Sequence, residues 1–313
     1  MTMSGAPDRM APATTARTVA QAKINLFLRV LAREASGYHQ LETLFCRLEL
    51  GDDVVVRTDV RNRSLDASGD VIPPAGLGPV DRNLAWRAAE AFAKATGWPN
   101  AWAIEIRKRI PVGGGLGGGS ADAGAVLRCL NAISPAPLPT HALLALAASL
   151  GADVPFLSMD EPVALGWGRG ERLLPVPVLP ARAVVLACFP FGVSTPDAYR
   201  WLDDARDSFS PEAAVLELDR LGSWARIAQL AHNDFEAVVA PRFAAIATTL
   251  NEWRSHIDRI GDPEGIALLA GSGATVFLLS DRVPSALHDA PEPSPRIVRT
   301  STATRVVAVE VSD

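Results

Sequence analysis

The segment PVGGGLGGGSADAGAVL, residues 111–127, carries six glycines between positions 113 and 119, and Leu116 alone interrupts them. Glycine loses more backbone freedom on ordering than any other residue, so this density needs a reason. A flexible linker would have polar flanks, whereas this segment joins an alternating strand pattern to an amphipathic helix pattern. A helix N-terminus offers unpaired N–H groups and the positive end of a dipole. The segment therefore predicts a phosphate-binding loop, with a linker or packing glycines as the alternative.

The glycine segment differs from the common nucleotide-binding loops. A Walker A loop ends in Gly-Lys-Ser or Gly-Lys-Thr, and no lysine follows these glycines. Gly113, Gly115 and Gly118 fit the G-x-G-x-x-G spacing, but that pattern is weak by itself and the alternating strand-helix order is missing upstream. The protein-kinase signatures are absent too. Ser120 and Asp122 are both suitable N-cap residues for the helix that follows.

Lysine and tyrosine are scarce in this chain. Of 30 basic residues only Lys23, Lys94 and Lys108 are lysine, and Tyr38 and Tyr199 are the two tyrosines. A planar guanidinium replaces a compact ammonium poorly, so each lysine is a candidate for a specific task. We interpret Lys94, on a helix beside alanine and threonine, as a solvated surface residue.

Strands and helices alternate irregularly around the glycine segment. KINLFLRVL and LETLFCRLELGDDVVVRT predict strands, with a turn at Gly51-Asp52. Residues 81–97 predict a helix with Asp81 as N-cap. AWAIEIRKRI alternates with period two, which places Lys108 in phase with the apolar face. THALLALAASLG predicts a second helix after the one that follows the glycines.

The composition changes near residue 161, where strand and turn patterns begin. Helices are expected at roughly 223–240 and 242–257. A strand, glycine loop and strand follow in GIALLAGSGATVFLLS, and RVVAVEVS predicts a last strand. A length of 313 residues suits two domains. Residues 1–17, rich in alanine, threonine and proline, predict a disordered tail without the apolar core of a signal peptide.

Composition excludes several classes of function. The chain is 48% apolar and 21% charged with a net charge of −5, so nucleic acid and anionic membranes are not expected partners. No apolar run is long enough to span a bilayer. Cys46, Cys129 and Cys188 are distant and odd in number, which favours buried free thiols in a reducing cytoplasm over disulfides or a metal site.

The motif PVGGGLGGGSADA resembles the phosphate loop of the GHMP kinases. AKINLFLRVLAREASGYHQLETLFCRLELGDDV, LGADVPFL and AGSGATVFLL resemble, in the same order, the branch that phosphorylates a hydroxyl at the 2-position of a cytidine-diphosphate-linked methylerythritol in non-mevalonate isoprenoid synthesis. The resemblance covers roughly residues 18 to 280. It implies an α+β fold with a ribosomal-protein-S5-like N-terminal domain at 18–160 and a ferredoxin-like C-terminal domain at 161–313.

The resemblance implies a catalytic pair. Lys23 would lie near the acceptor hydroxyl and the γ-phosphate of ATP, and Asp153 would accept the hydroxyl proton. Asn25, two residues along the same strand, would support this site or the substrate. From the residues alone, Lys23 could be a strand-end surface lysine, Asp153 a turn carboxylate and Asn25 a polar edge residue.

The resemblance also implies ATP and Mg²⁺ as cofactors. Relatives often carry serines where this chain has Gly118 and Gly119, so the protein ligand of the magnesium ion stays undetermined. The ATP phosphates would lie on Pro111, Val112, Gly113, Gly114, Gly115, Leu116, Gly117, Gly118, Gly119, Ser120 and Ala121.

The substrate residues are the third implication of the resemblance. The base would stack on Tyr38, hydrogen-bond His39 through its edge and have Tyr199 on its other face. Ordinary loop or core positions remain the alternatives. Lys108 would contact phosphate or nucleotide, unless it is a snorkelling lysine. The remaining expected substrate contacts are Thr195, Gly271, Ser272 and Gly273.

Two rival functions stay open at this point. Another GHMP kinase, for homoserine or mevalonate, would not need the aromatic set Tyr38, His39 and Tyr199. A catalytically silent nucleotide-binding regulator would need the glycine loop but neither Lys23 nor Asp153. The expected assembly is a monomer or a homodimer.

Overall fold

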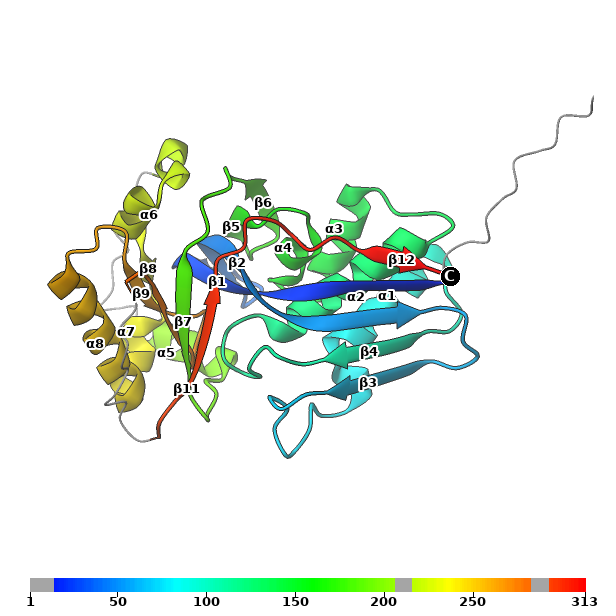
Figure 1. The fold of residues 1–313 in the computed structure, drawn as a ribbon, viewed down its shortest axis with the longest axis horizontal. Helices are drawn as coiled ribbons and strands as arrows, with labels where there is room; N and C mark the ends of the chain where they lie inside the picture. The colour runs from blue at the N-terminus through cyan, green and yellow to red at the C-terminus, as the bar shows by residue number, and fades with distance from the viewer. Residues whose placement is uncertain (1–13, 206–215, 283–292) are drawn as a thin grey trace, which may run out of the picture.

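The computed structural model describes residues 14–205, 216–282 and 293–313, which fold into two sheets with helices against them (Figure 1). The first 13 residues of the expected tail lie outside these ranges. Strand β1 already begins at Thr15, so the expected tail boundary at residue 17 is wrong by three residues. In the described part of the chain, no helix has the length and apolar character of a membrane span.

The first sheet is built on an antiparallel ribbon of two 19-residue strands, β1 (Thr15–Arg33) and β2 (His39–Arg57). Gln21 is opposite Gly51 and Lys23 is opposite Arg47, so β2 accommodates extra residues here in a bulge. The predicted turn at Gly51-Asp52 is wrong, because β2 continues through it. Buried positions on both strands of the ribbon fix this register, since a one-residue slip would expose them.

The two halves of the ribbon have different neighbours. The second half of β2 pairs with β4, and its first half pairs with β5. The other strands of this sheet attach at the edges. Their bounds are β3 (Ser64–Ser68), β4 (Ala103–Arg107), β5 (Val163–Gly168), β6 (Arg172–Pro175), β8 (His232–Asn233) and β12 (Glu310–Ser312).

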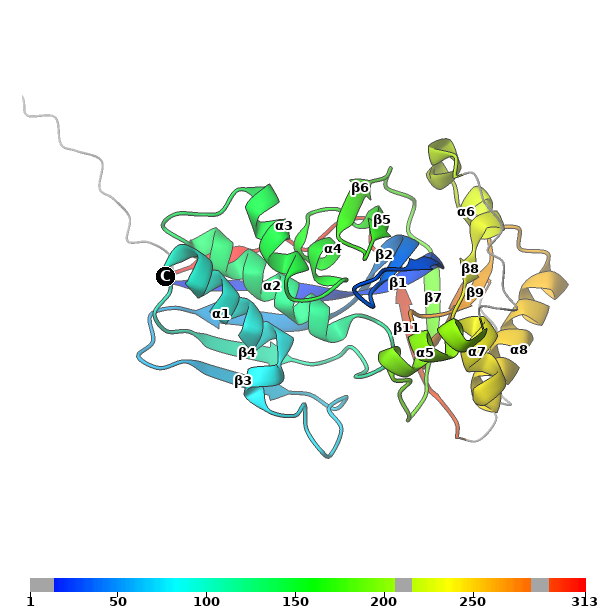
Figure 2. The same ribbon diagram turned by 180° about the vertical axis from the view of Figure 1, so that it is seen from behind.

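Four helices cover one face of this sheet (Figure 2). They are α1 (Leu84–Thr96), α2 (Gly118–Ile133), α3 (Thr140–Ala148) and α4 (Val154–Ser158), with the 3-10 turn η1 (Val80–Arg82) before the first. The predicted helix at 81–97 is confirmed, but its N-cap is Asn83 rather than Asp81. The Asn83 side chain accepts a hydrogen bond from the N–H of Ala85, and Gly97 ends the helix with a φ of 75°.

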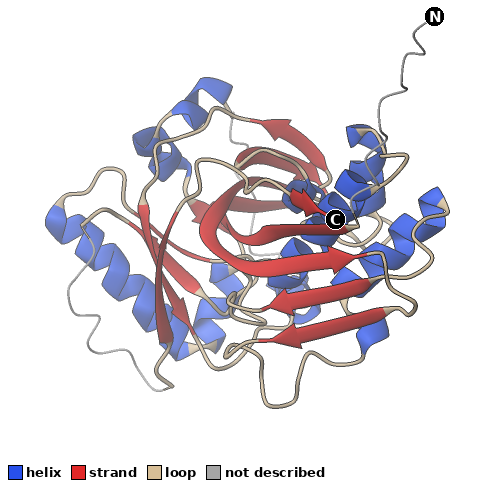
Figure 3. Cartoon of the chain, turned by 45° about the vertical axis from the view of Figure 1, so that its right-hand side comes forward, coloured by secondary structure: helices blue, strands red, loops and turns tan. Residues whose placement is uncertain are grey.

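The second sheet has four antiparallel strands in the order β11-β7-β10-β9. Counted along the chain this order is 4-1-3-2, the ferredoxin-like arrangement that the sequence predicted. Figure 3 shows its strands running in a different direction from those of the first sheet. The bounds are β7 (Ala183–Cys188), β9 (Ile266–Leu269), β10 (Val276–Leu279), β11 (Arg296–Ser301), α5 (Thr195–Ala205), η3 (Leu218–Gly222), α6 (Trp224–Leu230), α7 (Glu236–Val239), η4 (Ala240–Arg242) and α8 (Ala244–Ile260).

Alternate side chains of β7 belong to two different cores, one of which is shared with the first sheet. On β7, Val184 and Leu186 belong to the core shared with the first sheet, while Val185 and Ala187 belong to a second core that includes residues of α5, α7 and α8. The expected domain boundary at residue 160 is wrong, because β5, β6 and β12 all pair within the first sheet. The last strand, predicted at 305–312, is limited to β12.

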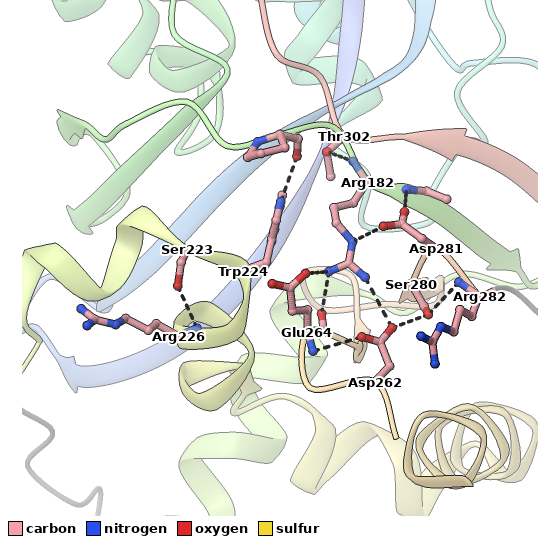
Figure 4. Close-up of polar contacts among 12 residues, drawn as sticks. Arg182, Ser223, Trp224, Arg226, Asp262, Glu264, Ser280, Asp281, Arg282 and Thr302 are labelled. Atoms are coloured by element: carbon pink, nitrogen blue, oxygen red, sulfur yellow. Dashed lines mark hydrogen bonds and ion pairs between the residues drawn. The ribbon is translucent and has the colours of Figure 1, made fainter. Parts of the chain in front are cut away.

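One buried arginine, Arg182, connects the strand ends at one end of the second sheet (Figure 4). Arg182 precedes β7, and its guanidinium pairs with Asp262 at 3.4 Å, Glu264 at 2.7 Å and Asp281 at 3.0 Å. Its side chain is 6% exposed, so this cation depends on those carboxylates. Its backbone N–H donates to Thr302 Oγ1, which ties the segment after β11 to the same point.

We predict that Arg182→Met lowers the free energy of unfolding by about 2–3 kcal/mol, because Asp262 and Glu264 lose charge-assisted hydrogen bonds and Asp281 loses its ion pair. Arg226→Met is the matched control, since Arg226 forms one exposed ion pair with Asp219. The control should change stability by less than about 0.5 kcal/mol. Urea unfolding measures both variants, and equal losses would contradict the structural role of Arg182.

Candidate active site

The glycine segment forms the N-terminus of α2. Gly113, Gly115 and Gly117 have φ values of 77°, 78° and 72°, which only glycine adopts readily. The helix begins at Gly118 with Gly117 as its N-cap, so the predicted caps Ser120 and Asp122 are wrong. The first N–H groups of the helix have no intrahelical acceptor. They adjoin a cavity of about 340 Å³ lined by residues 110–120, so all the predicted ATP residues except Ala121 line it.

The same glycines let two loops approach each other. A Cβ on Gly115 would lie 2.0 Å from the carbonyl oxygen of Ala270, in the loop between β9 and β10. The N–H of Thr275 donates to the carbonyl of Gly114 at 3.2 Å, and the N–H of Lys23 donates to the carbonyl of Leu116 at 3.0 Å. The segment is therefore a fixed loop rather than a linker, and part of its glycine content serves packing.

Lys23 and Asp153 meet where these loops join. Lys23 Nζ lies 3.3 Å from Asp153 Oδ2 and donates to Asn25 Oδ1 at 2.9 Å. The lysine side chain is 4% exposed and the aspartate 29%, so the carboxylate faces the open side. Asn25 Nδ2 donates to Thr43 Oγ1, which donates to the carbonyl of Phe27. A continuous hydrogen-bond chain on the β1–β2 ribbon thus orients the ammonium.

A buried arginine positions Asp153 from the opposite end of its helix. Asp153 is the N-cap of α4. Arg47 Nη2 donates to the carbonyls of Phe156 at 2.7 Å and Met159 at 2.9 Å, at the C-terminal end of α4. Burial is the main cause that lowers the pKa of Arg47, to about 9. Nothing in the sequence singled out Arg47, because its local pattern is that of an ordinary strand residue.

The predicted loop at 271–273 closes the other side of this cavity. Ser272 Oγ lies 2.9 Å from Thr195 Oγ1, so two predicted substrate residues contact each other. Asn233 Nδ2 donates to the carbonyls of Leu269 and Gly271, both at 2.8 Å, and holds this loop in place. The sequence segment HND contained this asparagine, but nothing local indicated its partner. The cavity is about 320 Å³ and is lined by Lys23, Asn25, Gly115, Gly117, Ser120, Asp153, Thr195, Gly271 and Ser272 among others.

The predicted base-binding residues line a larger cavity of about 1000 Å³. The rings of His39 and Tyr199 stack on each other at 4.4 Å, and His39 Nε2 lies 2.8 Å from Asp203 Oδ1. Tyr38 is 60% exposed and carries the guanidinium of Arg169 over its ring. We expected the base to have Tyr38 on one face and Tyr199 on the other. This geometry is wrong in one respect, because the ring of His39 already covers one face of Tyr199.

Lys108 has a different environment from the predicted one. Its ammonium lies 2.5 Å from Asp52 Oδ2 and 2.6 Å from Asp122 Oδ2, and its side chain is 4% exposed. Asp52 Oδ1 also accepts a hydrogen bond from the N–H of Ile110. This lysine links the strand before the loop to helix α2, which is a structural role. It also lines the loop cavity, so the predicted contact with phosphate or nucleotide stays a prediction.

The described residues offer no ready-made metal centre. Within them, no three histidine, cysteine, aspartate or glutamate side chains gather closely enough to hold an ion. All three cysteines are free and buried, as the sequence predicted.

The comparisons first define the class of this fold. The family described as "GHMP kinases N terminal domain" matches residues 83–161, which include the glycine loop and Asp153. The crystal structure of L. major mevalonate kinase in complex with R-mevalonate aligns with a TM-score of 0.64 at 13% identity, over 95% of this chain and 98% of that one. The fold is that of the GHMP kinases.

Relatives at higher identity then define the family. The 4-diphosphocytidyl-2-C-methyl-D-erythritol kinase of Anaeromyxobacter dehalogenans (strain 2CP-C) is 43% identical over 83% of this chain and 79% of its own length. That of Deinococcus radiodurans is 40% identical over 83% of each. A crystal structure of 4-(cytidine 5'-diphospho)-2C-methyl-D-erythritol kinase aligns with a TM-score of 0.66 at 33% identity, over 91% and 98% of the chains. This chain belongs to the 4-diphosphocytidyl-2-C-methyl-D-erythritol kinase family, and as a GHMP kinase it uses ATP.

We predict that Gly115→Ala lowers the free energy of unfolding by about 2–5 kcal/mol, because backbone strain adds to a clash with Ala270. Gly113→Ala is the matched control, since Gly113 has a φ of 77° but open space around its Cβ position. The control should lose only about 1–2 kcal/mol from strain. Urea unfolding compares the two, and calorimetry should show weaker ATP binding for Gly115→Ala. Equal stability losses would refute the packing role of Gly115.

A second prediction concerns the pH dependence of stability. Burial raises the pKa of Asp122 to about 8, although Lys108 opposes this shift. The pKa of an aspartate carboxyl in an unfolded chain is about 4. Between these values the folded state holds a proton that the unfolded chain releases, so stability should fall as pH rises from 6 to 8, by at most about 1.4 kcal/mol per pH unit.

Asp122→Asn should flatten this slope, because it removes the titrating group. Exposed Asp70→Asn is the control and should keep the wild-type slope. Urea unfolding at pH 6, 7, 8 and 9 measures all three proteins. A slope in Asp122→Asn equal to that of the wild type would show that Asp122 is ionised throughout.

Proposed function

We propose that this protein transfers the γ-phosphoryl group of ATP to the 2-position hydroxyl of 4-diphosphocytidyl-2-C-methyl-D-erythritol, a step of non-mevalonate isoprenoid synthesis. The observation that carries the proposal is the ion pair between buried Lys23 and partly exposed Asp153, at the place where two glycine loops meet. The cavity of this pair shares lining residues with the loop cavity on one side and with the aromatic cavity on the other. This arrangement suits a nucleotide and a long acceptor that meet at one point.

Asp153 is the general base in this proposal. Its partly exposed carboxylate accepts the proton of the attacking hydroxyl, which increases the nucleophilicity of that oxygen. Lys23 lies against the carboxylate and keeps it oriented, and its ammonium offsets negative charge on the transferring phosphoryl group. Asn25 fixes the ammonium through its 2.9 Å hydrogen bond. A short, fixed ammonium suits this place better than a guanidinium would.

The residues around the glycine loop fit the phosphates of ATP. The turn from Gly113 to Gly117 exposes backbone N–H groups at the start of α2, and the helix dipole favours an anion there. Mg²⁺, when bound, neutralises charge on the phosphates. Such an ion is held by phosphate oxygens and several waters, and it needs few protein ligands. We propose the hydroxyl of Ser120, which lines both the loop cavity and the Lys23 cavity, as a protein ligand.

The aromatic cavity would hold the cytosine. Tyr38 offers an exposed ring for stacking, and the ring of Tyr199 stacks on that of His39 and holds it in place. A carboxylate only accepts hydrogen bonds, so Asp203 fixes the proton of His39 on Nε2. In the neutral ring, Nδ1 is then an acceptor, which matches the exocyclic amine of cytosine and not the carbonyl of uracil. Thr195 and Ser272 would contact the acceptor between the two cavities.

Two other functions are weaker. Homoserine and mevalonate have no base that could stack in the aromatic cavity, so kinase activity on either would not use Tyr38, His39 and Tyr199. A silent nucleotide-binding protein would not need the Lys23–Asp153 pair, in which the buried Lys23 ammonium carries a desolvation cost. Phosphoryl transfer from ATP to the cytidyl substrate, homoserine and mevalonate distinguishes all three. Turnover of the cytidyl compound alone is the expected result, and no turnover of any acceptor would favour the silent protein.

The cellular setting is part of the proposal. The three buried free thiols are consistent with a reducing cytoplasm. The net charge of −5 gives no reason to expect nucleic acid or an anionic membrane as partner. We expect a monomer or a homodimer.

We predict that Asp153→Asn lowers kcat by about 10²–10⁴-fold, the usual contribution of a positioned general base. The ATP affinity should change little, because the loop backbone holds the phosphates. Asp160→Asn, with an 87% exposed side chain, is the control and should stay near wild-type activity. Lys23→Arg should also be poorly active. A kinetic assay with calorimetry tests these variants, and near-wild-type turnover by folded Asp153→Asn would exclude Asp153 as the base.

A further inference from the structure

The aromatic cavity and the cavity of Lys23 meet at a small shared boundary. Four residues line both of them, namely Ala152, Arg169, Thr195 and Tyr199. Arg169 alone among these carries a positive charge at neutral pH. Arg33, Arg87 and Arg200 line the aromatic cavity without reaching the other one, and Lys23 lines only its own cavity. The boundary between the two cavities therefore has one cation.

The proposed acceptor is long enough to occupy both cavities and to cross the boundary between them. Its cytidine and its methylerythritol are joined by a diphosphate. If cytidine lies in the aromatic cavity and the reacting hydroxyl lies beside Asp153, the diphosphate crosses the boundary. We propose that Arg169 binds this diphosphate and thereby makes the enzyme specific for a diphosphate-linked acceptor. This inference rests on the proposed function.

The contacts of Arg169 hold it in position for this task. It follows β5, and its backbone N–H donates to Glu171 Oε2 at 2.7 Å. Its Nη2 donates to Glu34 Oε2 at 2.5 Å and to Ser36 Oγ at 3.3 Å. Its guanidinium carbon lies 4.1 Å from the centre of the Tyr38 ring. The arginine therefore links the segment after β5 to the turn between β1 and β2, which carries the proposed base-binding ring of Tyr38.

The chemistry of this side chain suits a phosphate. Among the described residues, both side-chain hydrogen bonds of Arg169 use Nη2, so Nε and Nη1 remain as donors for a ligand. A guanidinium presents several donors in a planar fork, which matches phosphate oxygens. The side chain is 44% exposed, and an exposed ion pair such as Arg169–Glu34 contributes little to stability. The fold therefore does not require this arginine.

The test compares two competitive inhibitors of the cytidyl substrate at saturating ATP, which keeps the glycine loop occupied. Cytidine carries the base without phosphate, and cytidine diphosphate carries both. We expect the wild type to bind cytidine diphosphate more tightly than cytidine, and Arg169→Ala to lose about 10–100-fold of this preference. The inhibition constant of cytidine itself and the KM for ATP should stay unchanged. The KM for the cytidyl substrate should rise more than kcat falls.

Arg172→Ala is the matched control, since Arg172 lies on the same hairpin, has a 67% exposed side chain and lines neither cavity. Arg169→Gln is a second variant of similar length, in case the alanine variant is unstable. If the wild type phosphorylates the cytidyl substrate but both variants keep its preference for cytidine diphosphate, Arg169 does not bind the diphosphate. If the wild type does not phosphorylate that substrate, the proposed function itself fails, and the inference with it.

Discussion

The close approach of two glycine loops is the constraint on which the rest of this structure depends. The carbonyl of Ala270 occupies the space where a side chain of Gly115 would lie, and Thr275 bonds the backbone of Gly114. One loop belongs to the helix side of the first sheet and the other joins two strands of the second sheet. Any larger residue at Gly115 would push the sheets apart at the point where Lys23 is buried. This tight contact forms one wall of the cavity that Lys23 and Asp153 line.

Supporting hydrogen bonds orient the buried ammonium of Lys23 and its partner Asp153. An ammonium taken out of water must be paired or hydrogen-bonded, and Asn25 and Asp153 meet that need for Lys23. Thr43 fixes Asn25 from the neighbouring strand. Arg47 fixes the far end of the short helix that begins after Asp153. The lysine and the aspartate thus come from different elements, and each is held by its own buried network.

The two buried lysines, Lys23 and Lys108, both pair an ammonium with carboxylates, but they differ in their surroundings. Lys23 has one partly exposed carboxylate partner, whereas Lys108 lies between two buried carboxylates, Asp52 and Asp122, at the wall of the loop cavity. Both places need a compact ammonium, which explains why arginine does not replace lysine there. Lys94 is exposed on α1, as expected for a lysine without a specific task.

The sequence by itself determined α1, α2, α3 and α8, most strands, the fixed glycine loop and the family, because these depend on periodicity, turn chemistry and local motifs. It did not predict α4 or α5, and the single helix expected at 223–240 is wrong, since this stretch holds α6, β8 and α7. It could not separate the role of Lys23 from that of Lys108, since the distinction lies in which carboxylates face each ammonium. It also missed Arg47, Asn233 and the shared boundary at Arg169, whose partners are far away in the chain. Tertiary structure alone decided these points, because hydrogen-bond partners and cavity walls are set by which elements the core brings together.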